Sequence, residues 1–257
     1  MTASRDLAPR NDHLAQHRGF IVGRALATGL IGLVPVPALD HWLESAVRRS
    51  MIRHLAESRR VDLDDAALRV LADGKEPPPK VRALARASTV GMLLKRAWRK
   101  AVVFLAVAQR GVVVTRTFAV GTLFDHYCTR IHVGPGLTEA SGSELRDAID
   151  RAIAGTPARF LSRVFRRGLA MAARALWRAP FEVLDAATGG TVRRLIERGD
   201  EAAAEEVVDS ALTRAETEPQ GFLTRATRAT IAELAHAGDL YVSILVDRFE
   251  RTLGRKP

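Results

Sequence analysis

The chain is organised around Phe20–Leu55, which reads FIVGRALATGLIGLVPVPALDHWLESAVRRSMIRHL. The first half is apolar and rich in glycine and alanine. In the second half, apolar residues recur at every fourth position from Leu43 to Leu55, the period of a helix with one buried face. Two prolines separate the halves, and proline lacks the N–H that a helix interior needs. We therefore expect two helices joined as a hairpin.

Five residues define this predicted hairpin. Gly29 and Gly32 are small enough to let another helix approach the first helix closely. Pro35 and Pro37 end that helix, and Asp40 can accept a hydrogen bond from a free backbone N–H at the start of the second. A close-packed helical hairpin is the structure that these residues predict.

The apolar half raises the question of a membrane. Phe20–Leu39 carries one charge, Arg24, and its twenty residues would just cross a bilayer. A helix that ends near Val34, however, has about 15 residues and a length of roughly 23 Å, which is shorter than the roughly 30 Å hydrocarbon core. Burial within protein, peripheral insertion and membrane embedding all remain open for this segment.

A second apolar stretch spans Ala101–Phe124 but has Arg110 and Arg116 in its middle. Each central arginine costs about 2.5–3.5 kcal/mol on membrane-insertion scales. The two arginines are six residues apart, so they project from different faces of a helix. We expect this stretch to be buried within protein, and Val112–Thr115 is also compatible with a strand.

Changes in composition and the positions of proline and glycine divide the chain into four expected parts. Residues 1–19 read as a flexible arm and residues 20–74 as the hairpin module. Residues 75–79 form a proline-rich linker, and residues 80–257 form a helical domain.

Within these parts, a short helix is expected over Asp64–Ala72, stopped by Asp73–Gly74. A capping box of Ser141 and Glu144 is expected to start another helix. The predicted fold is all-α, a multi-helix bundle of roughly ten helices.

Charge is the strongest functional signal. The 257 residues include 39 Lys and Arg against 29 Asp and Glu, which gives a formal charge of +10. Such a balance favours an anionic partner, either phospholipid or nucleic acid. The single cysteine, Cys128, excludes an intrachain disulfide, and the first nineteen residues lack the apolar run of a secretory signal. We expect an intracellular protein.

The basic residues gather in two segments, Lys80–Lys100 and Ala158–Ala179. The second segment is an amphipathic helix with arginines on one side and apolar residues on the other. Its arginines either contact an anionic partner or form a solvated helix face, and the acids of residues 200–209 are candidates to pair with them. The predicted contacts to anionic lipid or nucleic acid are Arg82, Arg86, Arg96, Arg99, Lys100, Arg159, Arg163, Arg166, Arg167 and Arg174.

Motifs for chemistry are not found. The sequence has no G-x-x-x-x-G-K-[ST], G-x-G-x-x-G, G-x-S-x-G or H-E-x-x-H pattern. Asp125, His126, Cys128 and His132 are of types that bind zinc, but a structural zinc site needs four converging ligands and a second half with Cys or His is not found nearby. We expect no metal, no cofactor and no catalytic residues.

One resemblance carries further expectations. The glycine- and alanine-rich helix, the sequence VPVPALD and an apolar-basic helix ending in IRHLAESRRVDL together resemble the helical domain of unknown function of the YcjF type. That domain also occurs at the C-terminal end of some bacterial GTP-binding proteins. The similarity covers about residues 22–71, and Arg59–Arg60 stand where the family usually has an aromatic–glycine pair. It implies a bacterial, helical, membrane-associated module without established catalysis.

These observations lead to one main functional expectation. The chain is expected to be a non-enzymatic helical protein at the cytoplasmic face of a bacterial inner membrane, peripheral or partly embedded, acting as an adaptor or assembly factor. Its partner would be an anionic membrane surface or a membrane protein, and its oligomeric state stays open. The alternative is a soluble, basic, nucleic-acid-binding helical protein, and an enzyme built from scattered residues is third.

Overall fold

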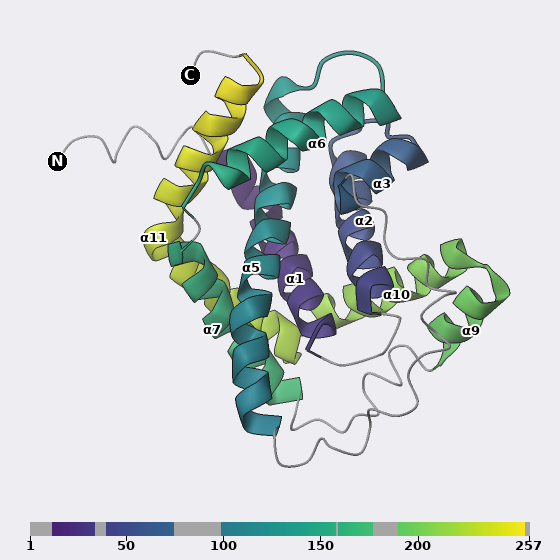
Figure 1. Cartoon of the computed structure of the whole chain (residues 1–257), viewed down its shortest axis with the longest axis vertical. Coiled ribbons are helices and arrows are strands. Elements are labelled where there is room, and N and C mark those ends of the chain that lie inside the picture. The colour runs from purple at the N-terminus through teal and green to yellow at the C-terminus, as the bar shows by residue number, and fades with distance from the viewer. Residues whose placement is uncertain (1–11, 34–39, 75–98, 158, 177–189, 255–257) are drawn as a thin grey trace.

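The computed structural model describes residues 12–33, 40–74, 99–157, 159–176 and 190–254, and their regular structure is almost entirely helical (Figure 1). The prediction of an all-α bundle is confirmed. The elements in order are η1 (Asp12–Leu14), α1 (Ala15–Ile31), α2 (Asp40–Ser58), α3 (Asp65–Asp73), α5 (Arg99–His126), the π-helical turn η2 (Tyr127–Ile131), α6 (Glu139–Ala154), α7 (Arg159–Leu176), α9 (Thr191–Arg198), α10 (Glu201–Thr217) and α11 (Phe222–Thr252).

Helix α1 is the centre of the bundle. Every residue from Ile21 to Leu30 is buried, and the helix contacts α2, α5, α7, α10 and α11. In Figure 1 it lies behind α5 and between α11 and α2. The apolar run that could have faced lipid is therefore surrounded by protein in this structure.

Glycine makes that close packing on α1 possible. A Cβ atom added to Gly29 would overlap Val114 of α5 and lie 3.1 Å from Leu169 of α7. A Cβ atom added to Gly32 would overlap the guanidinium group of Arg110. Pro35 and Pro37 lie outside the described residues, and Asp40 is the first residue of α2.

A second corner of the bundle joins α3 to α6. Asp64 caps α3 by accepting a hydrogen bond from Ala67 N, as the predicted helix start requires, and Gly74 ends α3 with φ of 80°. Residues Leu63 and Leu137 form a short parallel bridge, with Leu137 N donating to Asp62 O at 2.8 Å. This bridge fixes the loops that lead into the two helices.

The start of α6 corrects one prediction. The N-cap is Thr138, and Ser141 is the third helical residue, whose side chain accepts from the Thr138 backbone N–H. The capping box therefore begins three residues earlier than the Ser141–Glu144 pattern indicated. Serine in the third position gave the same hydrogen-bonding function as the expected Glu or Gln.

Helices α5 and α7 carry the apolar and basic stretches seen in the sequence. The strand alternative for Val112–Thr115 is wrong, because α5 is continuous there. Arg110 pairs with Glu44 of α2, and Arg116 pairs with Asp150 of α6, so the two arginines leave α5 in different directions.

Length and composition limit which helices could cross a bilayer. Among the described residues, no single helix is both long and apolar enough to cross a bilayer. One bent pair within α11, Phe222–Ala235 and Asp239–Thr252, meets the criteria when its two halves are taken together across an 80° bend.

The close approach at Gly29 predicts a large cost for one added methyl group. Gly29→Ala should lower the free energy of unfolding by about 1–3 kcal/mol, because the methyl group overlaps Val114. Urea denaturation measures the change. Gly19→Ala on the same helix is the matched control: its Cβ would lie 3.7 Å from Ile231, an ordinary contact, so stability should stay equal or rise by up to about 1 kcal/mol. Equal effects of the two substitutions would contradict the packing described for α1.

Candidate functional site

The exposed arginines of α7 form the most prominent charged surface of the predicted basic segments. Arg159, Arg163, Arg167 and Arg174 are exposed, and we call these four residues the basic edge. The opposite side of α7 is buried, through Leu161, Val164, Phe165 and Leu169.

Two contacts reduce the free positive charge on this side of α7. Arg166 is only half-buried, and its aliphatic portion packs where a side chain on Gly111 of α5 would be. Arg167 forms an ion pair with Glu233 of α11, in which the arginine is mostly exposed and the glutamate partly exposed. Surface pairs of this kind contribute little to stability, so they leave the charge available to a stronger anion.

The start of α5 lies at the same end of the molecule as the end of α7. The two helices pack side by side in opposite directions, as the contact of Gly111 with Arg166 and Figure 1 show. Arg99 and Lys100 are the first residues of α5. Arg82, Arg86 and Arg96 lie outside the described residues, and so do the side chains of Arg99 and Lys100.

The acids of residues 200–209 have other partners than the sequence suggested. Glu205 pairs with Arg49 and Arg53 of α2, and Asp209 pairs with Arg24 of α1. Helix α10 thus places these acids against α1 and α2 rather than against α7. Sequence proximity to the basic helix was misleading because α9 and α10 pack on the other side of the bundle (Figure 1).

Arg24 is the centre of a buried polar cluster. Its side chain is 2% exposed and its guanidinium group lies 2.8 Å from Asp209 and 2.9 Å from Glu216, both on α10. It also donates to Ser50 Oγ of α2 at 2.9 Å, and it lies 5.0 Å from the ring centre of Phe20. These contacts satisfy a charge that would be costly to bury alone.

Glu216 is the weakly ionised member of this cluster. Burial raises its pKa to about 7, and repulsion by Asp209 adds to the rise, while the attraction of Arg24 opposes it. The carboxyl of Asp209 is half exposed, and its pKa is lowered overall. Burial raises this pKa, but the hydrogen bond from Ser50 and the charge of Arg24 together lower it by more. Asp209 and Glu216, which both pair with Arg24, therefore titrate in different pH ranges.

A second buried cluster surrounds Asp125 on α5. The Asp125 carboxylate is fully buried, and it accepts a hydrogen bond from Arg59 Nε at 2.9 Å and lies 3.0 Å from His17 Nδ1. These partners come from α1 and from the end of α2. The carboxylate therefore joins three parts of the chain that are distant in sequence.

The next residue, His126, makes a separate set of contacts. His126 Nε2 lies 3.1 Å from Glu250 of α11, and its Nδ1 lies 3.0 Å from His13 Nε2. Since the carboxylate is an acceptor, His126 donates from Nε2 and accepts at Nδ1. Burial, followed by the proximity of His13, lowers the pKa of His126, which is consistent with a neutral ring.

The zinc-type residues of the sequence consequently do not converge. Asp125 and His126 have the partners just described, and burial raises the pKa of Cys128 to about 12, which disfavours the metal-binding thiolate. His132 instead lies next to Tyr127. In the part of the chain that the structure describes, no group of three or more His, Cys, Asp or Glu side chains is arranged to hold a metal ion.

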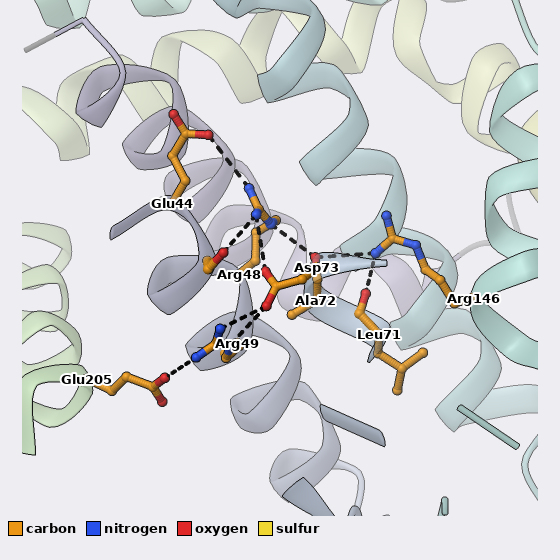
Figure 2. A network of polar contacts seen from close by, with 9 residues as sticks. Glu44, Arg48, Arg49, Leu71, Ala72, Asp73, Arg146 and Glu205 are labelled. Carbon is orange, nitrogen blue, oxygen red and sulfur yellow. Dashed lines mark hydrogen bonds and ion pairs between the residues drawn. The ribbon is translucent and has the colours of Figure 1, made fainter. Parts of the chain in front are cut away.

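A third network fastens α3 to its neighbours (Figure 2). Arg48 donates to the carbonyl oxygen of Ala72, and Arg146 of α6 donates to those of Leu71 and Ala72, at the C-terminal end of α3. These carbonyl groups have no partner within the helix, and positive side chains there also complement the helix dipole. Burial lowers the pKa of Arg146.

The same network reaches α10. Arg49 makes two hydrogen bonds to Asp73 and a third to Glu205, so it joins α2, α3 and α10 (Figure 2). The buried networks are thus arginine-based joints between helices. The basic edge of α7 differs from these networks, because its four arginines are exposed on one side of a single helix.

Comparisons with known proteins add no assignment: the chain matches no protein-family model, no curated protein and no solved structure. The resemblance of residues 22–71 to the YcjF-type domain accordingly stays a prediction.

Removal of the buried carboxylate of Asp125 should be strongly destabilising. Asp125→Ala leaves Arg59 without its buried partner and should lower the free energy of unfolding by about 3–5 kcal/mol. The matched control is Glu233→Ala, which removes the partly exposed partner of Arg167 and should cost about 1 kcal/mol or less. Chemical denaturation of both variants measures the free energy of unfolding. A decrease below about 1 kcal/mol for Asp125→Ala would refute the role given to this carboxylate.

The raised pKa of Glu216 predicts a specific pH dependence. The unfolded chain releases this proton near pH 4.5 and the folded chain near pH 7, so the group's contribution is fully present below 4.5 and is lost as pH rises to about 7. Relative to Glu216→Gln, the wild-type chain should lose stability across this window and then level off. Thermal unfolding at a series of pH values measures the difference, and a difference that does not vary with pH would contradict the raised pKa.

Proposed function

We propose that this chain is a non-enzymatic helical protein that associates peripherally with the anionic cytoplasmic face of a bacterial membrane, as an adaptor or assembly factor. The observation that carries the proposal is the basic edge of α7, four exposed arginines on a helix whose other side is fixed in the core. Arginine binds phosphate groups well because its planar donors match the phosphate oxygens.

The packing of α7 favours electrostatic association over insertion. An amphipathic helix that inserts into a bilayer needs a free apolar side. The apolar side of α7 contains Phe165 and Leu169, both fully buried in the bundle. Contact through the arginines alone leaves this packing intact.

The burial of α1 also supports a peripheral rather than an embedded protein. The apolar residues of α1 already contact protein on all sides, so embedding them would require the bundle to open. A surface attraction of about 1 kcal/mol for each arginine near anionic lipid needs no such rearrangement.

Vesicle binding tests this proposal. At low ionic strength the chain should bind vesicles containing phosphatidylglycerol and should fail to bind neutral phosphatidylcholine vesicles. The variant Arg159→Gln/Arg163→Gln/Arg174→Gln should bind the anionic vesicles roughly 100-fold more weakly, on the basis of about 1 kcal/mol for each arginine. Cosedimentation over a range of lipid concentrations measures the change.

A control of equal charge isolates the basic edge from the net charge. Arg69→Gln/Arg198→Gln/Arg214→Gln removes three exposed arginines from α3, α9 and α10 and should leave binding nearly unchanged. Equal losses in the two triple variants would show a diffuse charge effect and sink the proposal. Absence of vesicle binding together with salt-sensitive retention of DNA or RNA would replace it with the nucleic-acid alternative.

A further inference from the structure

Helix α10 is attached to the bundle by an unusually polar interface. Of its seventeen residues, only Ala204 and Val208 are buried, whereas α1 of the same length buries eleven. Val207, Leu212 and Ala215 are partly buried against the core, and charged or hydroxyl groups make further contacts to α1 and α2. The apolar contribution that fixes a helix in the core is therefore smaller for α10 than for α1.

The contacts follow one side of α10. Glu205, Val208, Asp209, Leu212 and Glu216 stand at positions i, i+3, i+4, i+7 and i+11, which share one face of a helix. Glu205 pairs with Arg49 and Arg53, and Asp209 and Glu216 pair with Arg24. The acids and the apolar residues alternate in a pattern that is complementary to the surface beneath.

That surface consists of Arg24 on α1 and Arg49, Ser50 and Arg53 on α2, and we call it the α10-binding face. Its arginines keep partners when α10 is removed: Arg24 still has Ser50, and Arg49 still has Asp73. Water then reaches both guanidinium groups, so detachment strands no buried charge. Asp209, whose side chain is 49% exposed, is already partly hydrated, and salt weakens its pairing.

The connection to α11 holds the C-terminal end of α10, so a displacement of α10 would be hinged there. Residues 218–221 link α10 to α11, and Thr224 Oγ1 donates to the carbonyl groups of Glu216 and Glu218 at the end of α10. Helix α9 packs mainly on α10, so the two form one unit at the side of the molecule (Figure 1).

We propose that α10 is a displaceable occupant of the α10-binding face, and that this face accepts an acidic amphipathic helix of a partner protein in its place. The expected partner helix resembles α10. It carries acidic residues at the positions of Glu205, Asp209 and Glu216, with apolar residues between them. This face is separate from the basic edge of α7, which is directed at a lipid surface.

Hydrogen exchange on the full chain tests the first half of the proposal. Glu205→Gln/Asp209→Asn removes the two acids that contact Arg49 and Arg24, and exchange of α9 and α10 should accelerate at least about tenfold while α1 stays protected. Glu201→Gln/Glu206→Gln removes two exposed acids from the same helix and should leave exchange unchanged. Acceleration of α1 together with α10, or no acceleration of α10, would overturn the proposal.

A peptide tests the second half. The probe is a labelled synthetic peptide with the sequence of Asp200–Glu218, titrated onto full-length protein at low salt. The Glu205→Gln/Asp209→Asn protein should bind it at least about tenfold more tightly than the wild type, because its own α10 competes less well. A peptide carrying the same two substitutions is the control and should bind more weakly. Equal binding of the two peptides, or no gain over the wild type, would overturn the partner assignment.

Discussion

The burial of one arginine constrains the arrangement of the N-terminal and C-terminal halves. Arg24 lies in the middle of an apolar helix that is enclosed on all sides, and a guanidinium group cannot be buried there without acidic partners. Those partners, Asp209 and Glu216, come from α10, while Ser50 comes from α2. The position of α10 against α1 is thereby tied to a residue nearly two hundred positions earlier in the chain.

Arginine side chains also link helices elsewhere in the bundle. Arg59 meets Asp125, Arg49 meets Asp73 and Glu205, and Arg146 caps the end of α3. Between these joints, glycine lets the helices approach closely, most clearly at Gly29. The inner arginines are thus matched within the fold, and the basic edge of α7 is turned to solvent. This division separates the charges that hold the bundle together from the charges that can act on a partner.

Local structure could be predicted from the sequence because its causes are local. The apolar period of α2, the short helix after Asp64, the stop at Gly74 and the two-sided character of α7 all appear within one or two helical turns. The start of α6 was placed three residues late, because Ser141 in the third helical position of the capping box resembles an N-cap. The turn at Arg60, with φ of 57°, gave no sequence signal, since this region of φ usually favours glycine.

The polar clusters could not be predicted in the same way. Arg24 stood out as the one charge in an apolar run, but its acidic partners lie 185 or more residues away. Asp125 was noticed as a metal-ligand type, although its role is to bind Arg59 and His17 from other helices. Such pairs depend on how helices assemble, which no spacing within one segment encodes. The exposure of Arg159, Arg163, Arg167 and Arg174 follows from the pattern of a single helix, whereas Arg166 of the same segment packs partly against α5.

The most direct test of this account is a double-mutant cycle between α1 and α10. Arg24→Gln, Asp209→Asn and the combined variant are compared with the wild-type chain by urea denaturation at neutral pH. If Arg24 holds α10 in place through Asp209, the two substitutions are coupled by at least about 1 kcal/mol. Strictly additive losses would contradict the account, because they would mean that the burial of Arg24 and the position of α10 are independent.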